Sequence, residues 1–380
     1  MRTVHFQLDD EARAFRDDVR AHLDEVLTPE FEERIYRSGV AHDDDFARGL
    51  VEKDLFAPDR RLLERQLLQD ELMYSDAPVY LSETTRMVAG VIDKAGSEEL
   101  KRRIIPKAMA AELTIALGFT EPECGSDVAA ASTRAVRSGD DWIINGSKMF
   151  TTNGHIADYV FLLARTNPDK PKHKGLTMFL VPLDSPGVEA QAVWTLSGER
   201  TNITFYTDVR VSDEYRIGGV DEGWSVLSLA LEDEHASGWG PHLKRLLEHA
   251  EQWAREATDA DGAARISDPD VRRRLSRIAI EFEVATLLQR RCVWMAEQGQ
   301  SPVAEGPMSK LFSTEALVRA AQDVNEFVGP DALRSRYEPT APEDGRFEYL
   351  MRFSLGTTIY AGTSEVQRTI IAQRGLGLPR

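Results

Sequence analysis

The sequence predicts an α+β protein in which a helical zone, a β zone and a second helical zone follow one another. Apolar residues recur at helical spacing in the first part, alternate with a period of two in the middle, and return to helical spacing afterwards. Turn signals and β-branched residues gather in the middle part. We therefore expect three domains, which span residues 1–115, 116–218 and 219–380.

The composition excludes several classes of function. A formal net charge of −17 argues against a general affinity for nucleic acid or for anionic membrane. Two cysteines, Cys124 and Cys292, are too few for a disulfide framework or a thiolate metal site, so we expect no metal and a reducing compartment. No signal region is visible, and no apolar run reaches the roughly 18 residues of a membrane span. We expect a cytoplasmic protein.

The first zone is predicted to consist mostly of helices, because its apolar residues fall on single helical faces. Two groups carry this prediction: Phe15, Val19, Leu23 and Val26, and then Leu62, Leu63, Leu67 and Leu72.

The middle zone is predicted to consist of strands. Residues 142–150 have the pattern of a hairpin around an Asn145-Gly146 turn, because both central residues of such a turn need positive φ. Further strands are expected at residues 159–164, 176–181 and 204–211.

The third zone returns to helices. Its apolar periodicity runs through Leu231, Leu246, Leu275, Ile278, Leu287, Val318 and Val324. Residues 238–241, Gly-Trp-Gly-Pro, predict a kink or break. A capping box of Ser364 and Gln367 predicts the start of the last helix, which stops at Gly375.

Three segments of the chain carry candidate chemistry. They are residues 117–127 (Leu-Gly-Phe-Thr-Glu-Pro-Glu-Cys-Gly-Ser-Asp), 145–154 (Asn-Gly-Ser-Lys-Met-Phe-Thr-Thr-Asn-Gly) and 360–368 (Tyr-Ala-Gly-Thr-Ser-Glu-Val-Gln-Arg). Taken alone, the first is equally a strand-to-turn connection and the second a hairpin with a core aromatic residue. Together, and in this order, they resemble the flavin-contacting segments of the acyl-CoA dehydrogenase family. That resemblance implies an N-terminal helical domain, a middle β-barrel-like domain and a C-terminal four-helix bundle.

The resemblance implies FAD as the cofactor. Glycine permits close approach of the backbone, and amide and hydroxyl donors suit a buried anion. In the second segment an aromatic ring would pack on the isoalloxazine, and a threonine would hydrogen-bond near its N5 atom. Their spacing of two predicts that both lie on one strand face. The residues assigned to the cofactor in this way are Phe119, Thr120, Gly125, Ser126, Phe150, Thr152, Thr363 and Glu365.

The third segment carries alanine, Ala361, where most family members place the catalytic glutamate. In the isovaleryl-CoA and long-chain branches, and in several actinobacterial sterol side-chain enzymes, that glutamate comes from an earlier helix that starts after a Gly-aromatic pair. Counting from Gly223-Trp224 places Glu234 at this position, although three successive acids at residues 232–234 also fit a solvated helix face.

The resemblance leaves the backbone N–H of Ala361 as the donor to the substrate oxygen. Substrate contacts are expected at Ser126, Leu231, His235 and Gly362. His235 stands where the family usually has arginine, and Arg265 is the one candidate in residues 259–268 for the arginine through which a neighbouring subunit holds FAD.

The implied reaction is FAD-dependent α,β-dehydrogenation of an acyl-CoA or acyl carrier protein thioester to the trans-2-enoyl thioester. Electrons would pass to an electron-transfer flavoprotein. The departures from the family pattern resemble the sterol-degrading actinobacterial group, some of whose members pair unlike subunits, so we expect a homo- or hetero-oligomer, either dimer or tetramer. Two alternatives stay open: a non-catalytic or half-site subunit of a heteromeric enzyme, and an oxygen-using flavin enzyme of the same fold.

Overall fold

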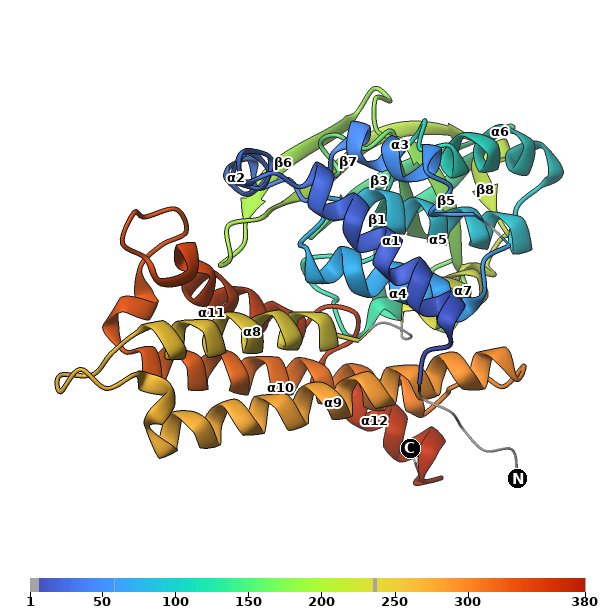
Figure 1. Ribbon diagram of the computed structural model, residues 1–380. Coiled ribbons are helices and arrows are strands. Elements are labelled where there is room, and N and C mark those ends of the chain that lie inside the picture. The colour runs from blue at the N-terminus through green and yellow to red at the C-terminus, as the bar shows by residue number, and fades with distance from the viewer. Residues whose placement is uncertain (1–6, 58, 235–237, 380) are drawn as a thin grey trace. The chain divides into compact units, whose positions relative to one another are not determined.

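The computed structural model describes residues 7–57, 59–234 and 238–379 (Figure 1). The chain divides into two compact units, one made of Met1–Thr28, Pro58–Asp76 and Glu234–Arg380, the other of Pro29–Ala57 and Ala77–Asp233. The N-terminal helices are shared between these units, so the limits 1–115, 116–218 and 219–380 stay a prediction about the sequence. Within the described ranges, none of the helices combines the length and the apolar character that crossing a membrane requires.

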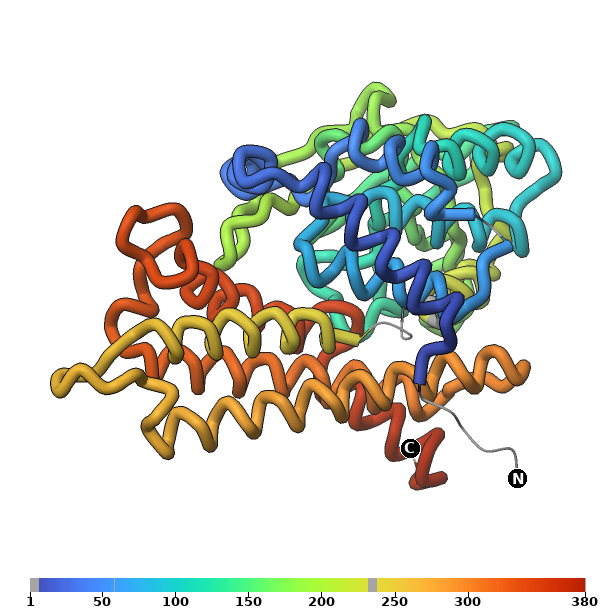
Figure 2. Tube along the Cα trace, viewed as in Figure 1, coloured from blue at the N-terminus to red at the C-terminus, as the bar shows by residue number. Residues whose placement is uncertain are grey.

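The first unit is helical. Figure 2 traces its long helices α8, α9 and α10 as neighbouring rods, and each packs against the next. Its helices are α1 (Asp10–Val26), α4 (Leu62–Tyr74), α8 (Gly240–Glu256), α9 (Pro269–Glu297), α10 (Glu305–Val328), α11 (Arg346–Thr357) and α12 (Ser364–Ile370). Short helical turns lie at η3 (Arg265–Ser267), η4 (Pro330–Leu333), η5 (Pro342–Gly345) and η6 (Ile371–Gly375).

Most of the apolar residues expected on the helical faces of this unit are buried, but Leu62 at the start of α4 is exposed. Phe15, Val19 and Leu23 of α1 are buried, and the Asp9 carboxylate caps the helix by accepting from the N–H of Ala12 at 2.8 Å. In the bundle, the buried apolar core includes Leu246, Leu275, Ile278 and Val324. Leu287 was expected on the same pattern, but it is exposed on the surface of α9.

The second unit holds one eight-stranded sheet in the order β6-β7-β3-β2-β4-β5-β8, with β1 beside β4. β1 and β2 run parallel to β4, and the other pairs are antiparallel. The strands are β1 (Ile115–Gly118), β2 (Arg134–Ser138), β3 (Asp141–Lys148), β4 (Tyr159–Arg165), β5 (Leu176–Pro182), β6 (Val188–Trp194), β7 (Arg200–Ser212) and β8 (Arg216–Ile217). The helical, β and helical zones of the α+β prediction are confirmed.

The expected hairpin at Asn145-Gly146 is wrong. β3 continues through both residues, and the turn lies one strand earlier, at Gly139 with φ 67°, between β2 and β3. Asn145 instead secures a bulge in β7: its amide donates to Asp208 Oδ1 at 3.0 Å and its side-chain oxygen accepts from the Asp208 N–H at 2.9 Å. Asp208 has φ 49°, and the register between β3 and β7 shifts there.

Helices α5 (Tyr80–Ala95), α6 (Glu98–Met109) and α7 (Gly223–Glu234) pack on the sheet of the second unit, which also contains α2 (Pro29–Ser38) and α3 (Asp44–Glu52). One shared apolar core contains Val88 and Ile92 of α5, Leu180 of β5 and Leu227 of α7. The break expected at residues 238–241 agrees with the separation of α7 from α8, which begins at Gly240 with Pro241 in its first turn.

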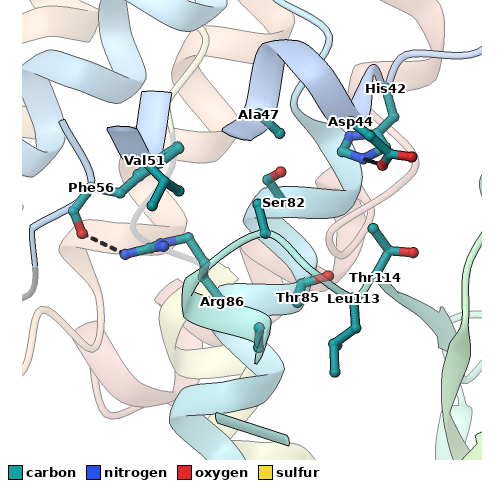
Figure 3. Close-up of a pocket in the computed structure, with 12 residues that line it drawn as sticks. His42, Asp44, Ala47, Val51, Phe56, Ser82, Thr85, Arg86, Leu113 and Thr114 are labelled. Carbon is teal, nitrogen blue, oxygen red and sulfur yellow. Dashed lines mark hydrogen bonds and ion pairs between the residues drawn. The ribbon is translucent and has the colours of Figure 1, made fainter. Parts of the chain in front are cut away.

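A small cavity of about 10 Å³, lined by both apolar and polar side chains, lies in the second unit (Figure 3). His42 Nε2 is 3.0 Å from Asp44 Oδ1, and the Arg86 guanidinium donates to the carbonyl oxygen of Phe56. Burial lowers the pKa of His42, against the opposing effect of Asp44. A cavity of this size holds about one water molecule, so it is not a site for an acyl thioester.

Candidate active site

The first candidate segment, residues 117–127, begins at the end of β1 and is held by contacts with the end of β3. Lys148 Nζ, at the end of β3, lies 2.8 Å from Glu121 Oε1 and donates to the carbonyl oxygen of Phe119 at 3.1 Å. The N–H of Met149 donates to the carbonyl oxygen of Thr120 at 2.8 Å. These contacts join the loop of residues 119–127 to the end of β3, so the first and second segments form one structural block.

Glu121 stays ionised in this block. Burial by itself would raise the pKa of Glu121, but the Lys148 charge and hydrogen bonds from Lys148 and Ser132 outweigh it and hold the pKa at about 2. The carboxylate accepts from the N–H and the hydroxyl of Ser132, both at 2.7 Å, and from the N–H of Thr133 at 2.9 Å. A fully satisfied buried pair of this kind fixes the shape of the loop above it.

The second segment continues β3 as far as Lys148 and then forms a tight turn. Phe150 lies in this turn with φ 61°, so the expectation that Phe150 and Thr152 share one strand face is wrong. The Phe150 ring is 54% exposed, whereas Thr152 is partly buried, with its hydroxyl 3.3 Å from that of Thr201. Asn202 fixes the turn, since its amide donates to the carbonyl oxygen of Thr151 at 2.9 Å.

The cofactor residues expected in the second unit lie on these two neighbouring segments. Gly125 and Ser126 are exposed, Thr120 is partly buried, and Phe119 packs edge-on against Phe161 with ring centroids 5.6 Å apart. The block therefore presents backbone and hydroxyl donors together with an exposed aromatic ring. A single exposed ring is common on protein surfaces, so its importance here rests on its position beside these donors.

Helix α7 begins directly on the sheet. A Cβ at Gly223 would meet the carbonyl carbon of Leu176 and the Cα of Thr177 at 2.7 Å, so only glycine allows this contact. Leu231 is partly buried against the core of the second unit. Glu234 is the last residue of α7. Its side chain, and His235 as a whole, lie outside the described residues.

The third segment lies in the first unit, between α11 and α12. Ala361 and Gly362 both have positive φ, 54° and 80°. Thr363 is the N-cap of α12, and its hydroxyl oxygen accepts from the N–H of Val366 at 3.2 Å. The N–H of Glu365 itself and the Thr363 hydroxyl lower the pKa of the exposed Glu365 carboxyl, as expected at a helix N-terminus.

The capping box of Ser364 and Gln367 is therefore wrong by one residue. Ser364 is inside the helix, and the Gln367 amide donates backwards to the carbonyl oxygen of Ala361 at 2.9 Å. Lys310 of α10 donates to the carbonyl oxygen of Gly362 at 2.7 Å.

The sequence pattern missed the buried polar side chains beneath the segments: Glu121, Lys148, Lys310 and Gln367. Glu121, Lys148 and Gln367 lie within the quoted segments and Lys310 lies far from them in sequence, and the partner of none of them can be identified from local spacing. Arg265 donates to the carbonyl oxygen of Phe327 at 2.9 Å within its own unit.

Family models match this arrangement along nearly the whole chain. They are the acyl-CoA dehydrogenase N-terminal domain at residues 9–112, the middle domain at 116–210 and the C-terminal domain at 221–376. The chain belongs to the acyl-CoA dehydrogenase family. The resemblance drawn from the sequence is thereby confirmed, and with it the class of enzyme: an oxidoreductase family whose members dehydrogenate acyl-CoA with FAD.

Mycobacterial acyl-CoA dehydrogenases and a structure named as a steroid ACAD are among the similar proteins. Acyl-CoA dehydrogenase FadE26 of Mycobacterium tuberculosis is 33% identical over 391 residues, covering 96% of each chain. A structure named Tcur3481-Tcur3483 steroid ACAD is 28% identical with a TM-score of 0.92, covering 99% of this chain and 100% of that one. The ChsE4-ChsE5 complex from M. tuberculosis is 32% identical with a TM-score of 0.89, and the match covers 99% of this chain and 100% of that one.

The candidate cofactor residues that lie in the second unit are chemically compatible with FAD. A flat ring system needs an apolar surface, which the exposed Phe150 ring provides, and a pyrophosphate needs neutral donors, which the exposed Gly125-Ser126 stretch provides. The Glu121–Lys148 pair is buried next to these residues. The Glu121 carboxylate already accepts hydrogen bonds from the protein and is paired with the Lys148 charge, so it does not repel an anion bound there.

Proposed function

We propose that this acyl-CoA dehydrogenase converts an acyl-CoA thioester to its trans-2-enoyl thioester, with Glu234 as the base. The observation that carries the proposal is the turn at residues 360–363. It has the fixed backbone expected of the oxygen-binding turn, but alanine at position 361 leaves it without a carboxylate. The base must then come from another element, and α7 ends in Glu234.

The chemistry requires both a base and an oxygen donor. The α-proton of a thioester is too weakly acidic for a carboxylate to remove unless the negative charge that develops on the oxygen is stabilised. The backbone N–H of Ala361 donates to that oxygen whatever the side chain, so alanine keeps this role. Glu234 accepts the α-proton. When bound, FAD supplies the acceptor for the β-hydride.

The helix that leads to Glu234 packs on the second unit. Ala230 is buried in the core of that unit, and Leu231 is partly buried against it.

The test is Glu234→Gln, with Asp233→Asn as the matched control on the same helix. Both variants should purify yellow with bound flavin, but only Glu234→Gln should lose bleaching of the flavin absorbance when acyl-CoA is added under anaerobic conditions. Full bleaching in Glu234→Gln would remove the assignment.

We propose a bulky, sterol-derived acyl-CoA as the substrate and an electron-transfer flavoprotein as the electron acceptor. The support for the substrate is the similarity to a structure named as a steroid ACAD. A panel of acyl-CoAs, in which steroid-derived thioesters reduce the enzyme faster than straight chains, tests it. Rapid reoxidation of the reduced enzyme by oxygen would favour the oxygen-using alternative.

A heteromeric assembly is the second candidate. The chain matches one chain of a structure named as the ChsE4-ChsE5 complex over 99% of its length. We propose that it pairs with an unlike acyl-CoA dehydrogenase subunit that completes the flavin site. A protein that is colourless when expressed alone and yellow when co-expressed with a neighbour-encoded partner would support this. A yellow and active protein expressed alone would contradict it.

A further inference from the structure

The turn between α11 and α12 has an unusual backbone. Ala361 and Gly362 follow one another with φ of 54° and 80°. The left-handed region is unfavourable for any residue with a Cβ, so surrounding contacts must keep Ala361 there. At Gly362 a Cβ would also meet Gln367 Nε2 at 2.8 Å, so glycine is needed for this approach as well as for the conformation.

Two buried donors hold the carbonyl groups of this turn. Gln367 Nε2 donates to the carbonyl oxygen of Ala361 at 2.9 Å and approaches that of Gly362 at 3.4 Å. Lys310 Nζ donates to the carbonyl oxygen of Gly362 at 2.7 Å. The Gln367 side chain is on α12 and that of Lys310 on α10, and the two residues are 0% and 1% exposed. Solvent therefore does not compete for either contact.

The ends of the turn are fixed too. The N–H of Tyr360 donates to the carbonyl oxygen of Gly356 at 3.2 Å, and that of Ser364 to Thr358 at 3.0 Å. In a planar trans peptide the C=O of one residue and the N–H of the next share a plane, so the bonds to the Ala361 and Gly362 carbonyls directly orient the N–H groups of Gly362 and Thr363. The Ala361 N–H lies in the preceding plane, which is joined to this fixed plane through the left-handed backbone of Ala361. Contacts that hold the Ala361 conformation therefore also hold the direction of its N–H. Among the described residues, the N–H groups of residues 361–363 have no protein acceptor. The carbonyl groups of Ala361 and Gly362 thus accept hydrogen bonds from the protein, whereas the N–H groups of the turn are available to a ligand acceptor.

We infer that Gln367 and Lys310 are positioning residues that fix the Ala361 N–H in the direction needed to bind the thioester oxygen. The inference rests on the proposed function. It adds the two residues that hold the backbone N–H of Ala361 in a fixed direction, so that this donor can bind the thioester oxygen without help from its own side chain.

The experiment uses two near-isosteric variants without donors, Gln367→Met and Lys310→Met, in the flavin-loaded protein. Affinity is measured by flavin spectral titration for two probes of equal length: a 3-thia-acyl-CoA thioester, and an alkyl-CoA thioether that lacks the carbonyl oxygen. Each variant should lose on the order of tenfold in thioester affinity, the effect of one misdirected hydrogen bond. Thioether affinity should stay unchanged.

Matched controls come from the same two helices. Thr369→Val on α12 and Arg319→Met on α10 remove an exposed hydroxyl and an exposed cation, and both should keep the wild-type preference for the thioester. Lys310→Arg, which restores a cationic donor, should recover part of the preference. Gln367→Glu, which places an acceptor against the Ala361 carbonyl, should lose it, and it also serves if the methionine variant does not fold.

An unchanged thioester preference in the variants, or an equal loss for both probes, would overturn the inference. A wild-type protein that does not prefer the thioester over the thioether would instead count against the proposed function, because the Ala361 donor would then have no partner.

Discussion

Lys148 and Glu121 form a buried ion pair in which Nζ and Oε1 are 2.8 Å apart and the residues are 0% and 4% exposed. The lysine also donates to the carbonyl oxygen of Phe119, and the carboxylate accepts from Ser132 and Thr133. The pair therefore ties the end of β3 to the loop after β1 and to the residues before β2. Loss of either partner would leave a buried charge without compensation.

Lys148→Met should lower the free energy of unfolding by about 3–5 kcal/mol, because the Glu121 carboxylate would stay buried and unpaired. Denaturant unfolding measures this. The control is Arg210→Gln, which breaks the solvent-exposed pair of Arg210 with Asp141 and should cost about 1 kcal/mol or less. A loss for Lys148→Met no larger than for the control would mean that the pair does not stabilise the block.

The same pair predicts a dependence on acid. The Glu121 pKa is about 2 in the folded protein against an ordinary 4.5, so the folded state favours the ionised form. Its contribution to stability is complete above the ordinary value and is lost as the pH falls toward 2. The stability difference between wild type and Glu121→Gln should therefore narrow as the pH falls through this range. A constant difference would contradict the assignment.

Phe150→Ala should separate binding from folding. The ring is 54% exposed, so its removal should change the free energy of unfolding by only about 0.5 kcal/mol. On the proposed function it should weaken FAD binding, seen as a lower flavin-to-protein ratio after gel filtration. Phe161→Ala, whose ring is fully buried, is the contrasting variant and should lose about 3–5 kcal/mol. Undiminished flavin content in Phe150→Ala would rule out the ring contact.

Gly223→Ala should displace the start of α7, because the new Cβ would lie 2.7 Å from backbone atoms of β5. Backbone cannot move aside cheaply, so we expect a loss of about 1–3 kcal/mol, the usual cost of overpacking. Gly90→Ala in α5 is the matched control, since nothing lies within 4 Å of its added Cβ. The control should be stabilised by about 0.5–1 kcal/mol. Thermal unfolding of both variants distinguishes the two sites.

Asp70 on α4 predicts the opposite pH dependence to Glu121. Burial, helped by the nearby Glu71 and opposed by a hydrogen bond from Gln66, raises the pKa of Asp70 to about 7. The folded state holds the proton more tightly than the unfolded state, so this contribution is complete at acid pH and is lost as the pH rises through 7. Asp70→Asn should flatten the stability profile between about pH 4 and pH 7. The exposed Asp18→Asn should leave it unchanged.

The sequence predicted the regular elements better than the connections between them. Strands β4, β5 and β7 were expected within a few residues of where they lie, because their burial alternates or is continuous over one strand. The Asn145-Gly146 turn failed because its signal is local, whereas Gly146 serves a close approach: a Cβ there would meet Thr133 at 2.7 Å. Strands β1, β2, β6 and β8 gave no usable signal of their own.

The candidate site shows the same division. The exposed motif residues were recognisable because Gly125, Ser126 and Thr363 sit in contiguous segments. The buried side chains that hold those segments have partners 27 residues away for Lys148 and 52 residues away for Lys310. A helical or strand period describes only near neighbours, so a buried lysine within an amphipathic pattern is indistinguishable from a solvated one.

The bulge at Asp208 decides which side chains of the last part of β7 face inward. Thr204 and Tyr206 are buried before it and Val209 and Val211 after it, so the inward side changes from even to odd positions across the extra residue. Without that residue, Val209 and Val211 would turn to the exposed side of the strand. Chain length at one exposed position, with no change of chemical group, thus sets which side chains of β7 enter the core.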